Sequence, residues 1–193
     1  MSRFGYVMAA YCAAMAVIIT AFIHPSPRLI WNASASVPTG LYRVRGIASP
    51  KVGDLVAAMP LAPLSRYLAQ RHYLPRGVPM LKHVAAVAGQ TICRDGRAIL
   101  VDRSRLGQAR ERDRLGRPLP AWTGCRLLRP GEIFLMNPAA PDSFDGRYFG
   151  PVPVATIVGR LTPIWPSALP PPAPRSVGTP HLPSPDTSAR SLR

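Results

Sequence analysis

Two serines and one lysine are the residues of this chain best suited to nucleophilic chemistry. Ser34 and Ser36 lie in the hydroxyl-rich run of residues 32–42, which follows an apolar segment. Lys51 and Lys82 are the only lysines, and the rest of the 24 Lys and Arg side chains are arginines. Arginine keeps its proton in proteins, whereas a desolvated lysine amine can lose one. A lysine in apolar surroundings is therefore a candidate general base.

A β-strand over residues 80–87 positions this lysine. Its sequence, MLKHVAAV, is apolar and β-compatible and ends before Gly89. Burial among aliphatic neighbours would lower the pKa of the Lys82 amine towards neutrality, where it can accept a serine proton. Alternation along the strand predicts one face with Met80, Lys82, Val84 and Ala86, and an opposite face with Leu81, His83, Ala85 and Val87.

A Ser36–His83–Asp145 triad is the alternative arrangement. His83 falls on the face opposite Lys82, so at most one of the two can point at a given serine. A Ser–Lys dyad is the better chemical fit, with His83 as an ordinary structural histidine. The Ser36 amide and the Ser34 hydroxyl would then stabilise the oxyanion. The bland alternative makes both serines simple loop hydroxyls, as is common near Pro and Gly.

An uncharged apolar run over residues 4–23 has the length that a membrane-spanning helix needs, about 20 residues. A cleaved signal peptide is the rival, since Ala33-Ser34-Ala35 is an A-x-A pattern. We favour an uncleaved anchor, because the run exceeds the usual signal core of roughly 7–15 residues and lies far from that pattern. Arg3 before the run predicts that the rest of the chain faces out of the cytoplasm.

The remaining chain reads as one mainly β domain over residues 30–166, followed by a Pro- and Ser-rich tail, 167–193, that is disordered by composition. One short helix is expected over 64–73, and the Arg-rich residues 102–120 are expected to form a surface loop. Strands are expected over residues 41–44, 55–59, 80–87, 91–94, 98–101, 126–128, 132–136 and 156–161.

Three cysteines fit an oxidising compartment. Cys12 lies in the apolar run, which leaves Cys93 and Cys125 as a possible disulfide. Two buried reduced thiols are the alternative. No spacing matches a metal site, and no glycine-rich phosphate loop is present in the sequence, so we expect no metal and no cofactor.

The formal net charge of +15 suggests nucleic acid or an anionic membrane surface as a partner. The arginines are scattered, and no DNA-recognition helix or zinc pattern accompanies them. We therefore expect a basic solvated surface and no nucleic-acid partner, and the apolar run at residues 4–23 makes the membrane the expected partner.

Four motifs, in order and spacing, resemble the signal peptidase I superfamily, and within it the TraF-type conjugative-transfer signal peptidases. They are Asn32-x-Ser34-x-Ser36-x-Pro38-x-Gly40-Leu41-Tyr42, Gly53-Asp54, Leu81-Lys82-His83-Val84-Ala85 and Ser143-Phe144-Asp145-Gly146-Arg147-Tyr148-Phe149-Gly150. The resemblance covers residues 32 to 165 and implies a mostly β fold whose catalytic groove lies beside the membrane.

The resemblance also implies roles for individual residues. Ser36 matches the nucleophile, Lys82 the general base and Ser34 the oxyanion-hole hydroxyl. Ser143 matches the residue that orients the lysine amine, while Asp145 and Arg147 match a supporting ion pair. The implied protein is a single-pass inner-membrane serine endopeptidase with a periplasmic domain.

Only Val37 separates Ser36 from Pro38, whereas housekeeping signal peptidases have two residues there; this favours the conjugative type. The implied substrate is a pilin precursor or another exported subunit, released as a linear or a cyclised product. The alternatives are a general signal peptidase and a catalytically silent component of the secretion apparatus. A self-cleaving repressor-like regulator shares the Ser–Lys chemistry, but here an apolar segment stands in place of a DNA-binding domain.

Overall fold

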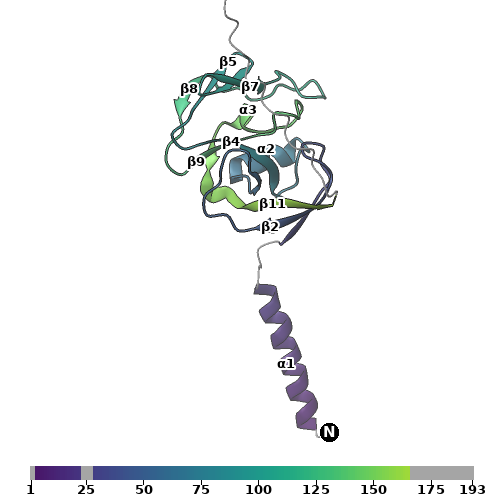
Figure 1. Cartoon of the computed structure of the whole chain (residues 1–193). Coiled ribbons are helices and arrows are strands. Elements are labelled where there is room, and N and C mark those ends of the chain that lie inside the picture. Colours follow the sequence, from purple (N-terminus) through teal and green to yellow (C-terminus); the bar gives the residue numbers. More distant parts are fainter. Residues whose placement is uncertain (1–2, 23–27, 166–193) are drawn as a thin grey trace, which may run out of the picture.

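The structure is a computed structural model that describes residues 3–22 and 28–165 (Figure 1). The predicted tail, 167–193, and the last residue of the predicted anchor, 23, lie outside the described residues. The N-terminal helix α1 (Arg3–Phe22) is long and apolar enough to cross a membrane, and none of its most apolar window is buried. A signal sequence would meet the same criterion, so the choice of an uncleaved anchor stays a prediction.

The rest of the described chain is mainly β, as predicted, and forms two antiparallel sheets. In spatial order, the seven-stranded sheet contains β1 (Leu29–Asn32), β2 (Gly40–Arg45), β11 (Ile157–Trp165), β3 (Leu55–Ala58), β4 (Met80–Val87), β9 (Glu132–Met136) and β10 (Val152–Pro153). The four-stranded sheet contains β7 (Ser104–Gln108), β6 (Ala98–Val101), β5 (Thr91–Asp95) and β8 (Gly124–Leu127). Figure 1 shows β2 and β11 at one end of this β structure and β5, β7 and β8 at the other.

One hydrophobic cluster joins the two sheets. Ala86 of β4 and Phe134 of β9 pack with Ile92 of β5 and Ile99 of β6, and all four side chains are fully buried. Burial of an aliphatic or aromatic side chain contributes about 1.5–3 kcal/mol. The cluster therefore fixes the second sheet on the first and holds the central strands β4 and β9, which carry the site.

The helical content exceeds the single short helix that the sequence predicts. Helix α2 (Ala62–Gln70) is that predicted helix, with proline in its first turn, where the missing N–H leaves no bond unmade. A one-turn helix, α3 (Gly146–Phe149), and a 3₁₀ turn, η1 (Val154–Thr156), are additional. Both are too short to show a helical period in the sequence.

Two further expectations are wrong. Residues 104–108, predicted to lie in a surface loop, form the edge strand β7. Ala86 does not share the face of Val84, because the pairing of β4 with β9 shifts register between these two residues. A bulge of this kind places an extra residue in one strand and breaks the alternation. Val84 consequently packs with Leu135, whereas Ala86 packs with Phe134.

Candidate active site

The serine-bearing turn between β1 and β2 is organised by one buried amide. Asn32, which is 5% exposed, donates from Nδ2 to the carbonyls of Ser34, Val37 and Pro38 at 2.9 to 3.0 Å. Its Oδ1 accepts from the Ser34 amide at 3.0 Å and from the Ser34 hydroxyl at 2.8 Å. Because a single side chain satisfies five polar groups of the turn, the turn has a fixed shape.

This turn brings the two serine hydroxyls together. Ser34 Oγ and Ser36 Oγ are 3.1 Å apart. Ser36 is half-buried and Ser34 is exposed. Val37 and Tyr42 anchor the turn in a hydrophobic cluster, and the Tyr42 hydroxyl donates to the Pro38 carbonyl at 2.6 Å. The two hydroxyls thus lie near the surface, on a turn that is anchored by the buried side chains of Val37 and Tyr42.

Lys82 lies in the middle of the seven-stranded sheet and is only 5% exposed. It is paired with Val56 of β3, so the two side chains share a face. Burial lowers the pKa of the Lys82 amine to about 8; the nearby Asp145 carboxylate opposes this shift, and the Arg147 guanidinium adds to it. The amine is therefore close to the range in which it can act as a base near neutral pH.

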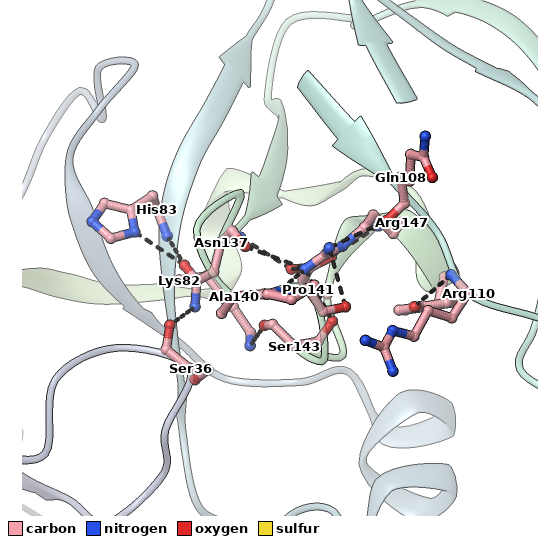
Figure 2. Close-up of polar contacts among 12 residues, drawn as sticks. Ser36, Lys82, His83, Gln108, Arg110, Asn137, Ala140, Pro141, Ser143 and Arg147 are labelled. Carbon is pink, nitrogen blue, oxygen red and sulfur yellow. Dashed lines mark hydrogen bonds and ion pairs between the residues drawn. The ribbon is translucent and has the colours of Figure 1, made fainter. Parts of the chain in front are cut away.

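The lysine amine donates to Ser143 Oγ at 2.6 Å (Figure 2). Ser143 is 5% exposed. Its amide donates to the Ala140 carbonyl at 3.0 Å, which closes a tight turn after β9. The buried Ser143 hydroxyl orients the amine. Because the hydroxyl is uncharged, its burial does not add the free-energy cost of removing a second charge from water.

A buried ion pair supports the Ser143 turn. Asp145 and Arg147 are 0% and 1% exposed. The guanidinium grips the carboxylate with two bonds, Nε to Oδ1 at 2.9 Å and Nη2 to Oδ2 at 2.8 Å. Arg147 Nη2 also donates to the carbonyls of Asn137 and Ala140, at 3.2 and 2.7 Å. The Arg147 guanidinium thereby connects the end of β9, the Ser143 turn and the start of α3 (Figure 2).

Gly146 lets this ion pair approach the sheet. A Cβ at that position would lie 2.6 Å from the Leu135 carbonyl oxygen and 2.6 Å from a ring carbon of Phe134. Only glycine fits such a contact with backbone. Asp145 is also the N-cap of α3 and accepts from the Arg147 amide at 3.2 Å.

Asn137 connects the Ser36 turn with β4, the strand that carries Lys82 (Figure 2). Asn137 Nδ2 donates to the Ser36 carbonyl at 2.9 Å. Over residues 3–22 and 28–165, no hydrogen bond joins Ser36 Oγ to Lys82 Nζ: the serine pairs with Ser34 and the lysine with Ser143. The assignment of these residues to nucleophile and base remains a prediction.

His83 takes a different position from Lys82. Its Nδ1 lies 3.0 Å from Asn137 Oδ1, and its backbone N–H donates to the same oxygen at 2.9 Å. An amide oxygen only accepts, so Nδ1 carries a proton in this contact. His83 thereby has a structural partner, and the Ser36–His83–Asp145 alternative finds no support in these contacts.

Asn137 is the site residue that the sequence interpretation did not identify. It is 2% exposed and uses all four hydrogen-bonding positions of its amide. One signal in the sequence was the pair Asn137-Pro138, which directly follows the apolar strand. The residue before a proline is restricted to an extended conformation, and this marks Asn137 as the point where strand pairing ends.

The possible disulfide lies away from these residues. Cys93 of β5 is directly opposite Cys125 of β8, and the structure joins their sulfurs. Whether the bond forms in the cell stays a prediction, with reduced thiols as the alternative. In the described part of the chain, no group of three His, Cys, Asp or Glu side chains could hold a metal ion.

Comparison with known proteins assigns the family. The family described as "Signal peptidase, peptidase S26" matches residues 1–165. The chain belongs to this family. It is therefore related to serine peptidases, and the resemblance to the TraF type, stated from the motifs above, is confirmed by relatives that carry that name.

Two relatives show how far this similarity extends. The "Probable conjugal transfer protein TraF" of Sinorhizobium fredii is 36% identical over 138 residues, which is 66% of this chain and 72% of that protein. The "Conjugal transfer protein TraF" of Agrobacterium fabrum is 32% identical over 148 residues, 69% of this chain and 80% of that protein. A solved signal peptidase I from Enterococcus faecalis is 20% identical, with a TM-score of 0.38, and covers 61% of this chain and 100% of its own.

Proposed function

We propose that this protein is a membrane-anchored serine endopeptidase with a Ser36–Lys82 dyad, which processes a pilin precursor or a similar exported subunit for conjugative transfer. The observation that carries the proposal is the buried Lys82 amine, with its pKa lowered to about 8 and its Nζ oriented by Ser143 at 2.6 Å. Family membership makes the substrate a protein. The named relatives support the conjugative role.

The first half of the reaction forms an acyl-enzyme. The neutral Lys82 amine accepts the hydroxyl proton of Ser36, and Ser36 Oγ forms a bond to the carbonyl carbon of the scissile peptide. The tetrahedral intermediate collapses as its C–N bond breaks, and the Lys82 ammonium returns the proton to the leaving amine. The new N-terminus leaves, and the other half of the substrate remains esterified to Ser36.

The developing oxyanion requires donors on the Ser36 side of the groove. The Ser36 amide and the Ser34 hydroxyl supply them. The Ser34 hydroxyl donates to Asn32 Oδ1 in this structure, so its proton has to turn towards the oxyanion when substrate binds. Asn32 then keeps its other bonds to the turn and holds it in place.

The second half of the reaction decides the product. Lys82 accepts a proton from the incoming nucleophile, which attacks the ester carbonyl, and Ser36 Oγ leaves with a proton from the lysine. If the nucleophile is water, the product is a linear chain with a free carboxylate. If it is the N-terminal amine of the same substrate, the product is cyclic and no water is consumed.

The protein should sit in the inner membrane with the β domain on the periplasmic side. Helix α1 supports the anchor by its length and composition, and a peptidase that processes exported precursors meets them outside the cytoplasm.

Mass spectrometry of a co-expressed pilin precursor tests the proposal. Full-length wild-type protein should shift the precursor mass by the removed segment, with a further loss of one water for a cyclic product. Ser36→Ala should leave the precursor intact. Unprocessed precursor with the wild-type protein, at equal expression, would favour a silent structural component instead. Processing of unrelated exported proteins as well would favour a general signal peptidase.

A further inference from the structure

Strand β9 ends at a point where the backbone ladder should continue. His83 of β4 is paired with Met136, the last residue of β9, so the next residue, Asn137, lies opposite Lys82. The main chain turns away here, and the Asn137 amide N–H donates to Asp145 Oδ2 at 3.0 Å. Beyond Met136, β9 therefore no longer pairs with β4 beside Lys82.

The side-chain amide of Asn137 provides partners for β4 at this point. Its Nδ2 donates to the Leu81 carbonyl at 3.2 Å, and its Oδ1 accepts from the His83 N–H at 2.9 Å. In a continuing antiparallel strand, these two groups would bind main-chain atoms of the residues before and after Asn137. Residue 138 is a proline and has no N–H to donate. The side-chain amide therefore takes the place of main-chain partners beside Lys82, while the main chain is free to place Ser143 against Lys82.

The same amide also reaches the serine turn. Asn137 Nδ2 donates its second proton to the Ser36 carbonyl at 2.9 Å (Figure 2). Since Oδ1 must face the His83 N–H, the amide nitrogen must face the two carbonyls, and the orientation of the group is fixed. One buried amide is thus bonded to the proposed nucleophile's own carbonyl and to the peptide groups that flank the proposed base.

We propose that Asn137 is the positioning residue that sets the placement of Ser36 relative to Lys82. This inference rests on the proposed Ser–Lys function. Asn137 does not touch substrate; it acts through the two backbone segments that carry the reacting groups. A change of about 1 Å in such a placement lowers the rate by about 10²-fold, because the reacting atoms leave the near-attack geometry.

Two substitutions test this role. In Asn137→Ala all four side-chain bonds are lost. Asn137→Asp keeps the shape and the acceptor for the His83 N–H, but turns an oxygen towards the carbonyls of Leu81 and Ser36. Both should lower kcat for precursor cleavage by about 10²-fold and leave KM within twofold, since the buried Asn137 side chain does not contact substrate.

Gln90 offers a matched control in the turn that follows β4. Its Oε1 accepts from the Val87 N–H, at the other end of β4, at 3.0 Å, and its Nε2 donates to Asp102 at 2.8 Å. Gln90→Ala removes an amide of the same type without touching the serine turn. Its kcat should stay within twofold of wild type, even where its thermal stability falls as much as that of the Asn137 variants.

The outcomes separate the two proposals. Kinetics are measured on full-length protein in detergent and scaled to the folded fraction from near-ultraviolet circular dichroism, with Ser36→Ala as reference. An inactive Ser36→Ala with a kcat within twofold of wild type in Asn137→Asp would overturn the positioning role alone. An equal loss of kcat in Gln90→Ala would also overturn it, because the effect would then be general destabilisation. An active Ser36→Ala would overturn the proposed function itself.

Discussion

In the loop that carries Ser143, one acidic residue precedes this serine and another follows it, and the two lie in opposite environments. Asp145 is 0% exposed and bound to a guanidinium that is itself 1% exposed. Asp142 is 30% exposed and pairs with Arg110 and Arg114, which are 48% and 76% exposed. The ion pairs have similar N–O distances, 2.8 Å inside and 2.6 to 2.7 Å outside.

Equal distances do not mean equal energies. Water screens the outer pairs and competes for them, so each contributes about 0–1 kcal/mol. The inner pair has no water to replace a lost partner, and breaking it leaves an uncompensated buried charge. The buried Asp145–Arg147 ion pair therefore fixes the geometry of the loop. Lys82 lies on the same, buried side of the loop.

Lys82→Met should have the largest effect on activity. Removal of the amine leaves no base for Ser36, and cleavage of precursor should fall by a factor on the order of 10⁴ or more. The same change should raise stability at pH 7 by about 1–3 kcal/mol, because the folded protein buries an ammonium whose pKa is lowered to about 8. Urea unfolding and a cleavage assay on the same sample measure both. An unchanged rate would exclude Lys82 as the base.

Asp145→Ala should be the most destabilising change at the loop. It leaves the Arg147 guanidinium buried without its carboxylate, and the free energy of unfolding should fall by about 3–5 kcal/mol. Chemical denaturation of the full chain in detergent measures this. A loss below 1 kcal/mol would mean that the inner pair behaves like the outer ones, and the comparison would fail.

Ser34→Ala removes one proposed oxyanion donor and should lower kcat by about 10²–10³-fold. The turn should survive, because the bonds from Asn32 to the carbonyls of Val37 and Pro38 do not involve the Ser34 hydroxyl. Single-turnover kinetics show whether the loss lies in acylation. A normal acylation rate would assign the oxyanion to other donors.

Asp142→Asn should have the smallest effect, with a loss of stability below about 1 kcal/mol that disappears in high salt. It is the outer counterpart of Asp145→Ala and shares the same assay. A loss that equals the inner one, or that persists at 1 M salt, would show that the outer arginines also fix the loop.

Patterns that depend on neighbours in the chain predicted much of the fold. Strand β4 matches its expected bounds, 80–87, because a long apolar, β-compatible run that stops at a Gly89 turn predicts a single strand. Strand β7 was missed because it is an edge strand with mostly exposed residues, so its sequence lacks the alternation that marks a half-buried strand.

The residues of the site also divide into those that sequence motifs predicted and one that they did not. Ser36, Lys82, Ser143, Asp145 and Arg147 were named from motifs, and the fold brings Lys82, Ser143, Asp145 and Arg147 within one network of short contacts. The role of Asn137 depends on where β9 stops pairing and on a turn 101 residues away in sequence. The local Asn137-Pro138 step marks the end of the strand but does not reveal these distant partners.

The pH dependence of kcat/KM for precursor cleavage tests the central claim most directly. Lys82 acts as a base only when neutral, so kcat/KM should rise about tenfold per pH unit below pH 8 and level off above the amine pKa of about 8. A rising limb centred near pH 6.5, the ordinary range of histidine, or a flat profile from pH 6 to 9 would contradict a lysine base.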